Sequence, residues 1–140
     1  MKDPVQEEII AEFTAFDEWL DKYDYLIELS DSLPAIDAAH RNDKYVIDGC
    51  QSRVWVDAEL REGKVYYTAD SDAIITKGII ALLVRALSGR TPQQIVDTDL
   101  YFIDAIGLGE NLSPTRSNGL RAMIKQMKLY ALAFATQQNA

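Results

Sequence analysis

The chain has 140 residues, of which 48% are hydrophobic, 26% charged and 9% aromatic, with 7 Gly and 4 Pro. This composition excludes collagen-like, low-complexity and disordered chains, and the length suits one domain, so we expect residues 1–140 to form a single domain. The formal net charge of −8 repels phosphate backbones and anionic lipid surfaces, so neither nucleic acid nor a membrane is an expected partner.

The cysteine and histidine counts narrow the chemistry further. Cys50 and His40 are the only residues of their types. One cysteine excludes an internal disulfide, a thiolate zinc site and a Cys-x-x-Cys redox pair, and one histidine excludes a multi-histidine metal site. We expect the chain to bind no metal and no cofactor of its own. Because no apolar run approaches the roughly 20 residues of a membrane span and the N-terminus leads into an acidic helix, we expect a cytoplasmic protein.

Charge is unevenly distributed along the chain. Residues 1–37 carry two basic and eleven acidic side chains, a net charge of −9, whereas residues 111–140 carry four basic side chains and no acidic one. A block of like charge is usually the solvated face of a helix; the other interpretation is docking against a charged partner protein.

Two helices are expected near the N-terminus. Apolar residues recur at helical spacing among acidic ones over residues 4–20, which predicts the first helix. Its expected inward positions are Ile9, Phe13, Phe16 and Leu20. A shorter helix is expected over residues 23–32, with Leu26 and either Leu29 or Ile27 turned inward, before a proline stops it.

From residue 45 the hydrophobic period changes to two, which predicts strands. A short strand is expected at residues 45–47 and a second over residues 54–60. A tight turn at Glu62-Gly63 then leads into a third strand over residues 65–68. This pattern is typical of an antiparallel meander of about three strands. Residues 48–52, which include Cys50, connect the first two strands.

The second half of the chain is expected to be helical. A central helix, apolar on nearly every side, is expected between the candidate N-cap residues Asp70, Ser71 and Asp72 and a closing Gly89. A short helix is expected from Thr91-Pro92, and residues 100–108 form a further apolar segment. A last helix is expected from Pro114 to about Gln137, with the inward stripe Leu120, Met123, Ile124, Met127, Tyr130 or Ala131, and Phe134. Helices before and after a meander predict an α+β domain with helices packed on one face of the sheet.

Cys50 is the residue most able to carry chemistry. A lone cysteine is usually a small buried hydrophobe, but Cys50 follows Gly49 and precedes Gln51 and Ser52 in a polar connection that can present a thiol to another protein. A cysteine hydrolase would need His40, which lies ten residues upstream in a polar linker. An iron–sulfur scaffold would need several thiolates. Sulfur transfer by thiol exchange needs one cysteine and no metal.

Three segments carry a resemblance to a known family. They are residues 49–55, where Gly-Cys-Gln-Ser runs into a Val-Trp strand; residues 70–73 together with Lys77-Gly78; and residues 112–119, Leu-Ser-Pro-Thr-Arg-Ser-Asn-Gly. In order and spacing these segments resemble the SufE proteins, which are sulfur acceptors for cysteine desulfurases. The departures are Ala69, where many members have Gly, and Asn118, where the family's late motif has Gln.

The resemblance implies a fold, a partner and a role. The implied fold is of the SufE/NifU-like type. Cys50 would accept persulfide sulfur from a SufS-like cysteine desulfurase, stimulate that enzyme and pass the sulfur to SUF iron–sulfur cluster assembly. Pyridoxal phosphate would belong to the partner, so the chain would be a carrier rather than a stand-alone enzyme. Similar proteins can form homodimers. The Gln51-Ser52 pair is closer to the SufE branch than to the related CsdE branch.

The resemblance also suggests supporting residues. Arg116, at the start of the last helix, would stabilise the Cys50 thiolate, or it is an unpaired surface arginine. Asp72 would cap the central helix, or it docks the partner or gates the cysteine connection. Gln51 and Ser52 would hydrogen-bond the sulfur or shape the turn after Gly49.

A different class of function stays open beside the carrier. In this alternative the chain is an acidic adaptor that activates a desulfurase allosterically, and Cys50 is structural.

Overall fold

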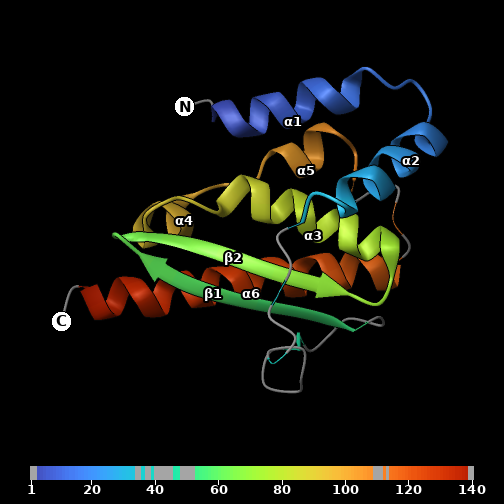
Figure 1. Ribbon diagram of the computed structural model, residues 1–140. Helices are drawn as coiled ribbons and strands as arrows, with labels where there is room; N and C mark the ends of the chain where they lie inside the picture. The colour runs from blue at the N-terminus through green and yellow to red at the C-terminus, as the bar shows by residue number, and fades with distance from the viewer. Residues whose placement is uncertain are drawn as a thin grey trace.

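A computed structural model describes residues 3–33, 36, 39, 46–47, 53–108, 112 and 114–138; for residues 114–116 and 138 it describes the backbone alone. Its elements in chain order are α1 (Pro4–Thr14), α2 (Trp19–Ser30), β1 (Val54–Arg61), β2 (Lys64–Ser71), α3 (Ile74–Leu87), α4 (Pro92–Asp97), α5 (Phe102–Ala105) and α6 (Pro114–Gln138) (Figure 1). The expected α+β class is confirmed, since helices pack on an antiparallel sheet.

Over the described residues, the sheet is a hairpin of β1 and β2. β1 and β2 pair in a register that sets Val54 opposite Ser71 and Arg61 opposite Lys64. Glu62 (φ 52°) and Gly63 (φ 79°) between them both have positive φ, the backbone of the two-residue turn that matches strand twist. The turn expected from the sequence is therefore confirmed.

The described part of the expected first strand, residues 46 and 47, lies beside β1. Val46 forms an isolated antiparallel bridge with Trp55, and residue 45 lies outside the described part of the chain. One residue further along β1, the carbonyl of Val56 accepts a hydrogen bond from the Tyr130 hydroxyl of α6 (3.0 Å). A side chain of α6 thus contacts the edge of β1 beside this bridge. The sheet among the described residues has two strands instead of about three.

The break between the first two helices comes earlier than the sequence predicted: α1 ends at Thr14 and α2 begins at Trp19, so the helix expected over residues 4–20 is too long. The ring of Tyr25 in α2 packs against Phe13 and Phe16, with ring centroids 5.2 and 5.3 Å apart. This aromatic contact requires the chain to turn back after α1. Leu20, expected to point inward, is consequently 70% exposed.

The inward positions of the two helices are otherwise as expected. Ile9 and Phe13 of α1 and Leu26 of α2 are fully buried. Of the two alternatives in α2, Leu29 packs against the core and Ile27 is exposed.

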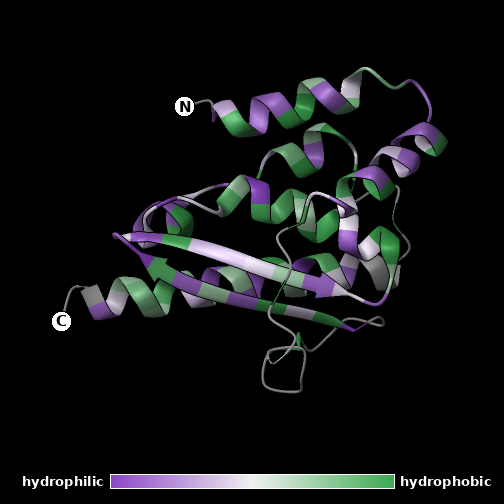
Figure 2. Ribbon diagram, viewed as in Figure 1, coloured by the Kyte–Doolittle hydropathy of each residue, from purple (hydrophilic) through white to green (hydrophobic). Residues whose placement is uncertain are grey.

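α3 is the centre of the core, as its sequence predicted. Ten of its fourteen residues are buried. Figure 2 shows hydrophobic residues along α3, whereas both colours alternate on α1 and α2. α2 crosses α3 so closely that a Cβ added at Gly78 would lie 2.2 Å from the carbonyl oxygen of Leu26. A residue with a side chain would force the two helices apart there.

The later helices complete the packing. α4 begins as expected, with a capping box in which the Thr91 hydroxyl accepts from the Gln94 N–H and the Gln94 side chain accepts from the Thr91 N–H. α6 lies against the inward face of the hairpin, where the buried Tyr67 hydroxyl donates to the carbonyl of Met127 (2.7 Å). Its buried hydrophobic side chains are Leu120, Met123, Met127, Ala131 and Ala135. Within the described residues, none of the helices combines the length and apolar character needed to cross a membrane.

Candidate functional site

The structure describes the residues on both sides of the segment that contains Cys50. Gly49, Cys50, Gln51 and Ser52 lie outside the described residues. Before them, the N–H of Ile47 donates to the carbonyl of Val54 (2.8 Å). The chain therefore leaves the sheet for the cysteine segment and returns to it at adjacent points, at the start of β1.

Asp72 hydrogen-bonds the backbone of Arg53, the first described residue after the cysteine segment, and this corrects its expected role. Asp72 does not cap α3: the N-cap is Ala73, which makes no side-chain capping bond. The Asp72 carboxylate instead accepts from the N–H of Arg53 (3.1 Å), and the Asp72 N–H donates to the Arg53 carbonyl (3.2 Å). The Arg53 N–H lies within reach of this carboxylate because the hairpin register sets Arg53, before β1, opposite Asp72, after β2. Asp72 thus fixes the first residue after the cysteine segment.

The other two candidate caps are also placed differently from expectation. Asp70 and Ser71 are the last residues of β2. The Asp70 carboxylate forms an ion pair with Lys77 on the first turns of α3 (3.4 Å). Lys77 is therefore engaged on the helix face. No cluster of three or more His, Cys or acidic side chains suited to a metal ion occurs in the part of the chain that the structure describes.

Two helices begin at the end of the sheet where the cysteine segment is attached. Figure 1 shows the N-terminal ends of α3 and α6 at the end where β2 finishes and β1 starts. Arg116 is the third residue of α6, as the sequence predicted, and its side chain lies outside the described residues. The partial positive charge at a helix N-terminus favours a nearby anion such as a thiolate.

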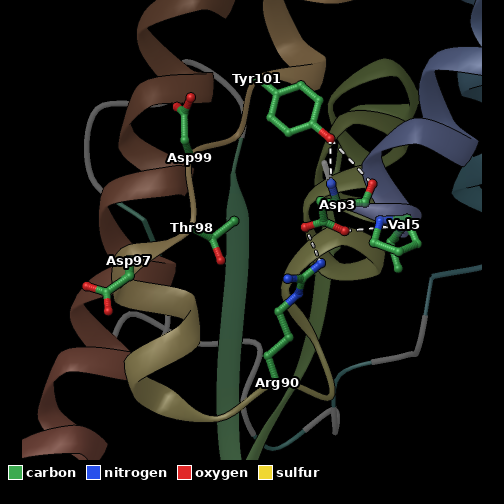
Figure 3. A pocket seen from close by; sticks show the side chains of 8 residues that line it. Asp3, Val5, Arg90, Asp97, Thr98, Asp99 and Tyr101 are labelled. Carbon is green, nitrogen blue, oxygen red and sulfur yellow. Dashed lines mark hydrogen bonds and ion pairs between the residues drawn. The ribbon is translucent and has the colours of Figure 1, made fainter. Parts of the chain in front are cut away.

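A second group of charged residues lies at the opposite end of the molecule, where the start of α1 lines an open pocket of about 700 Å³ (Figure 3). Here Asp3 pairs with Arg90 (2.5 Å), and the Tyr101 hydroxyl accepts from the Asp3 N–H (2.8 Å) and donates to Glu7 (2.9 Å). Partial burial favours the neutral carboxyl of Asp3, but hydrogen bonds from Gln6 and Arg90 outweigh burial and lower its pKa.

These polar groups are engaged with one another across long sequence separations, so they fasten α1 to the rest of the fold. Sequence reasoning did not identify this cluster. The one local signal was an Asp-Pro pair, which is a typical helix start: Asp3 is indeed the N-cap of α1.

Comparison with known proteins identifies a matching family and a matching fold. The family model described as "SufE: Fe-S metabolism associated domain" matches residues 7–131. The solution structure of a hypothetical protein from Thermus thermophilus has the same fold, with a TM-score of 0.79 at 22% sequence identity, over 97% of this chain and 99% of that chain. The family match spans all of the secondary structure from the first turns of α1 into α6. The chain therefore belongs to the SufE family, whose domain is associated with iron–sulfur metabolism.

Proposed function

We propose that the chain is a sulfur carrier that takes persulfide sulfur onto Cys50 from a pyridoxal-phosphate-dependent cysteine desulfurase and delivers it to iron–sulfur cluster assembly. The observation that carries the proposal is the attachment of its one cysteine: the connection that holds Cys50 is tied down on both sides, at Ile47 and at Arg53. Both ties lie at the end of the sheet where α3 and α6 begin. Membership of a family associated with iron–sulfur metabolism supports the same conclusion.

The chemical step needs no cofactor in this chain. The Cys50 thiolate attacks the outer sulfur of the partner's cysteine persulfide. A new sulfur–sulfur bond forms on Cys50, the sulfur–sulfur bond of the partner breaks, and the partner's cysteine leaves as a thiolate. One sulfur atom moves and there is no net oxidation or reduction. Pyridoxal phosphate stays in the partner, where it supplies the chemistry that releases sulfur from L-cysteine.

The attacking group has to be a thiolate, and the surroundings suit an anion. The N-terminal ends of α3 and α6 both lie at the end of the molecule to which Cys50 is attached. Arg116 adds a full positive charge in the first turn of α6. Together these groups would favour the thiolate over the thiol before the partner arrives.

The proposed partner is a SufS-like desulfurase in the cytoplasm, with the SUF scaffold complex downstream. A homodimer through the exposed leucines of α6 is compatible with sulfur transfer. Those leucines are Leu129 and Leu132, which are 46% and 49% exposed. Removing sulfur from the desulfurase persulfide would raise its turnover, which is how a carrier stimulates its donor.

The adaptor alternative has an observation of its own. α2 and the residues next to its two ends present a row of exposed acidic side chains: Asp17, Glu18, Asp21, Asp24, Glu28 and Asp31. A basic partner could dock there without using Cys50.

Substitution of Cys50 by Ser separates the carrier from the adaptor. Binding to a SufS-type desulfurase and the rate of alanine release from L-cysteine are measured with the wild type and with Cys50→Ser. We expect the variant to bind with unchanged affinity and to lose all stimulation, because only sulfur transfer needs the thiol. Stimulation that survives in Cys50→Ser would contradict the carrier and favour the adaptor.

A further inference from the structure

The outer face of α2 exposes apolar and acidic side chains along one line. Four positions at spacings of four, three and four residues share this face of the helix and its C-cap: Leu20, Asp24, Ile27 and Asp31. Leu20 is 70% exposed and Ile27 is 36% exposed, whereas Leu26 on the inward face is fully buried. Apolar and acidic side chains therefore alternate on the surface of this helix.

The carboxylates of this face have no counter-charge beside them. Four acidic residues follow one another at intervals of three or four positions: Asp21, Asp24, Glu28 and Asp31. Like charges at this spacing destabilise a helix. Among the residues that the structure describes, no ion pair joins these carboxylates to a cation. Lys22, the single basic residue of α2, lies over the ring of Trp19 instead (5.0 Å).

These features define the chemistry of a matching protein surface. Protein interfaces have an apolar centre and a polar rim, and exposed Leu20 and Ile27 supply the apolar part on this side. The carboxylates around them favour Lys and Arg on the other side. The twelve residues of α2 span roughly 18 Å, which is three turns of helix. A matching surface therefore presents basic side chains next to apolar ones over about three turns.

The position of α2 decides which partner this face suits. α2 crosses α3 at Gly78, near the start of α3, and Figure 1 shows α2 at the end of the molecule where β2 finishes and β1 begins. The chain leaves the sheet after Ile47 and returns to it at Arg53 at this same end. A protein docked on α2 therefore stands at the end of the molecule to which the proposed function brings the desulfurase.

We propose that the outer face of α2, formed by Leu20, Ile27 and the carboxylates beside them, is the docking site for a basic surface of the cysteine desulfurase. The proposal rests on the proposed function for the identity of the partner. Docking and sulfur transfer are separate steps, so the face serves a carrier and an adaptor alike.

A second copy of the chain fits this face less well. Its basic helix surface is on α6, where Arg121 and Lys125 are exposed, and Figure 1 shows α3 between α2 and α6. A contact from α2 of one copy to α6 of another joins two different surfaces and leaves one of each free. Such a contact extends into longer assemblies unless its rotation closes a ring.

The test measures the affinity of a SufS-type desulfurase for the full-length protein by titration calorimetry. In the double variant Asp24→Lys/Asp31→Lys we expect binding to weaken by about 10-fold or more, because two attractive contacts become repulsive. The difference from wild type is expected to shrink as salt is added, since exposed charges are screened. Both positions are exposed, so circular dichroism is expected to show an unchanged fold.

Asp97→Lys/Asp99→Lys is the matched control. It changes the net charge by the same amount at two exposed positions that line the pocket at the opposite end of the molecule (Figure 3). We expect this variant to bind with the wild-type affinity. Equal weakening in the two double variants would overturn the proposal, because the effect would then come from the net charge and not from α2.

Leu20→Ala tests the apolar part of the face without changing its charge. We expect binding to weaken by about 3- to 10-fold, the effect of losing one apolar contact, and the difference to persist in high salt. Because Leu20 is largely exposed, its replacement leaves the core intact. Wild-type affinity in either Leu20→Ala or Asp24→Lys/Asp31→Lys would overturn the proposal.

Sulfur uptake, read from the intact mass in the same mixtures, separates this proposal from the proposed function. A wild type that binds through α2 but gains no sulfur would refute the carrier and leave the docking site standing. A wild type that gains sulfur while Asp24→Lys/Asp31→Lys binds equally well would overturn the docking site and leave the carrier. Self-association of the protein alone in sedimentation, lost in Asp24→Lys/Asp31→Lys, would assign the face to a second copy and overturn the proposal.

Discussion

Asp72 connects two backbone segments that lie far apart in the sequence. Its carboxylate and its N–H both bond to Arg53, nineteen residues earlier. The sequence places Asp72 at the start of α3 and so predicts an N-cap, because that role needs only local spacing. The actual partner depends on the hairpin register, which local spacing does not reveal. The same holds for Ser71: its position near α3 predicts a cap, but its hydroxyl donates to the carbonyl of Arg53 across the hairpin.

The positive charge of Arg116 gives a prediction at the scale of one residue. Arg116→Ala is expected to slow persulfide transfer to Cys50 by up to about 5-fold, since a pair of exposed opposite charges contributes about 0.2–1 kcal/mol. Transfer is followed by intact-protein mass against time. Unfolding by denaturant is expected to match the wild type.

Two further variants make the Arg116 experiment specific. Arg116→Lys keeps the charge and is expected to retain most of the rate. Arg121→Ala removes an exposed charge from the same helix, more than one turn further on, and is expected to transfer sulfur normally. A rate unchanged in Arg116→Ala, or lowered equally in Arg121→Ala, would exclude a role for Arg116 at the thiolate.

At the scale of elements, the sequence predicts the helices and turns that depend on neighbouring residues, and it does not predict features that depend on tertiary contacts. The Glu62-Gly63 turn, the apolar α3 and the start of α4 at Pro92 follow from residue types at fixed spacing. The position of the break between α1 and α2 follows from a tertiary contact, the packing of Tyr25 on Phe16, whereas the helical period continues to Leu20 and places the break too late.

Gly78 gives a prediction for the crossing of α2 and α3. In an ordinary helix Gly→Ala stabilises by about 1 kcal/mol through helix propensity. At position 78 the new Cβ would meet the Leu26 carbonyl at 2.2 Å, so we expect Gly78→Ala to lower the free energy of unfolding by about 1–3 kcal/mol. Denaturant unfolding measures the change. Lys77→Ala, on the adjacent and partly exposed position, is the control and should change stability by less than about 1 kcal/mol. A stabilised Gly78→Ala would show that the helices do not cross this closely.

At the scale of the whole molecule, one ion-pair cluster joins the first three helices. Arg85 of α3 hydrogen-bonds Glu12 of α1 (2.9 Å) and pairs with Glu8, while the Tyr25 hydroxyl of α2 also donates to Glu12. The hydrogen bond from Arg85 lowers the pKa of Glu12, more than its partial burial raises it. Burial and the neighbouring Glu12 raise the pKa of Tyr25 to about 12.

The lowered pKa of Glu12 predicts how stability depends on pH. A carboxyl whose pKa is lower in the folded than in the unfolded chain stabilises the fold above its unfolded pKa, here near 4.5, and loses that contribution as the pH falls through the folded pKa. We expect Glu12→Gln to be less stable than wild type by about 1 kcal/mol at pH 7, a modest figure because the pair is partly exposed, and the difference to shrink in acid.

Denaturant unfolding at a series of pH values checks this difference. Glu8→Gln, which alters the exposed arm of the same cluster, is expected to lose less than about 0.5 kcal/mol. A difference between Glu12→Gln and wild type that stays constant from pH 7 into acid would contradict the role assigned to the Glu12 carboxylate.

The two ends of the molecule have different tasks. At one end Asp3, Arg90 and Tyr101 fasten the start of α1, and at the other Asp72 and Ser71 hold the attachment of the cysteine segment. Sequence motifs point to the second end through Cys50 and the residues around it. The first end becomes visible only in three dimensions, because its contacts join residues about ninety positions apart.

The measurement that tests the central claim most directly is the intact mass of the protein after incubation with a SufS-type desulfurase, pyridoxal phosphate and L-cysteine. Cys50→Ser is treated in parallel, and the activity of the desulfurase and its binding to both proteins are verified. The carrier requires a gain of one sulfur atom on the wild type, removed by reductant and missing from Cys50→Ser. No gain on the wild type under these conditions would contradict sulfur transfer through Cys50.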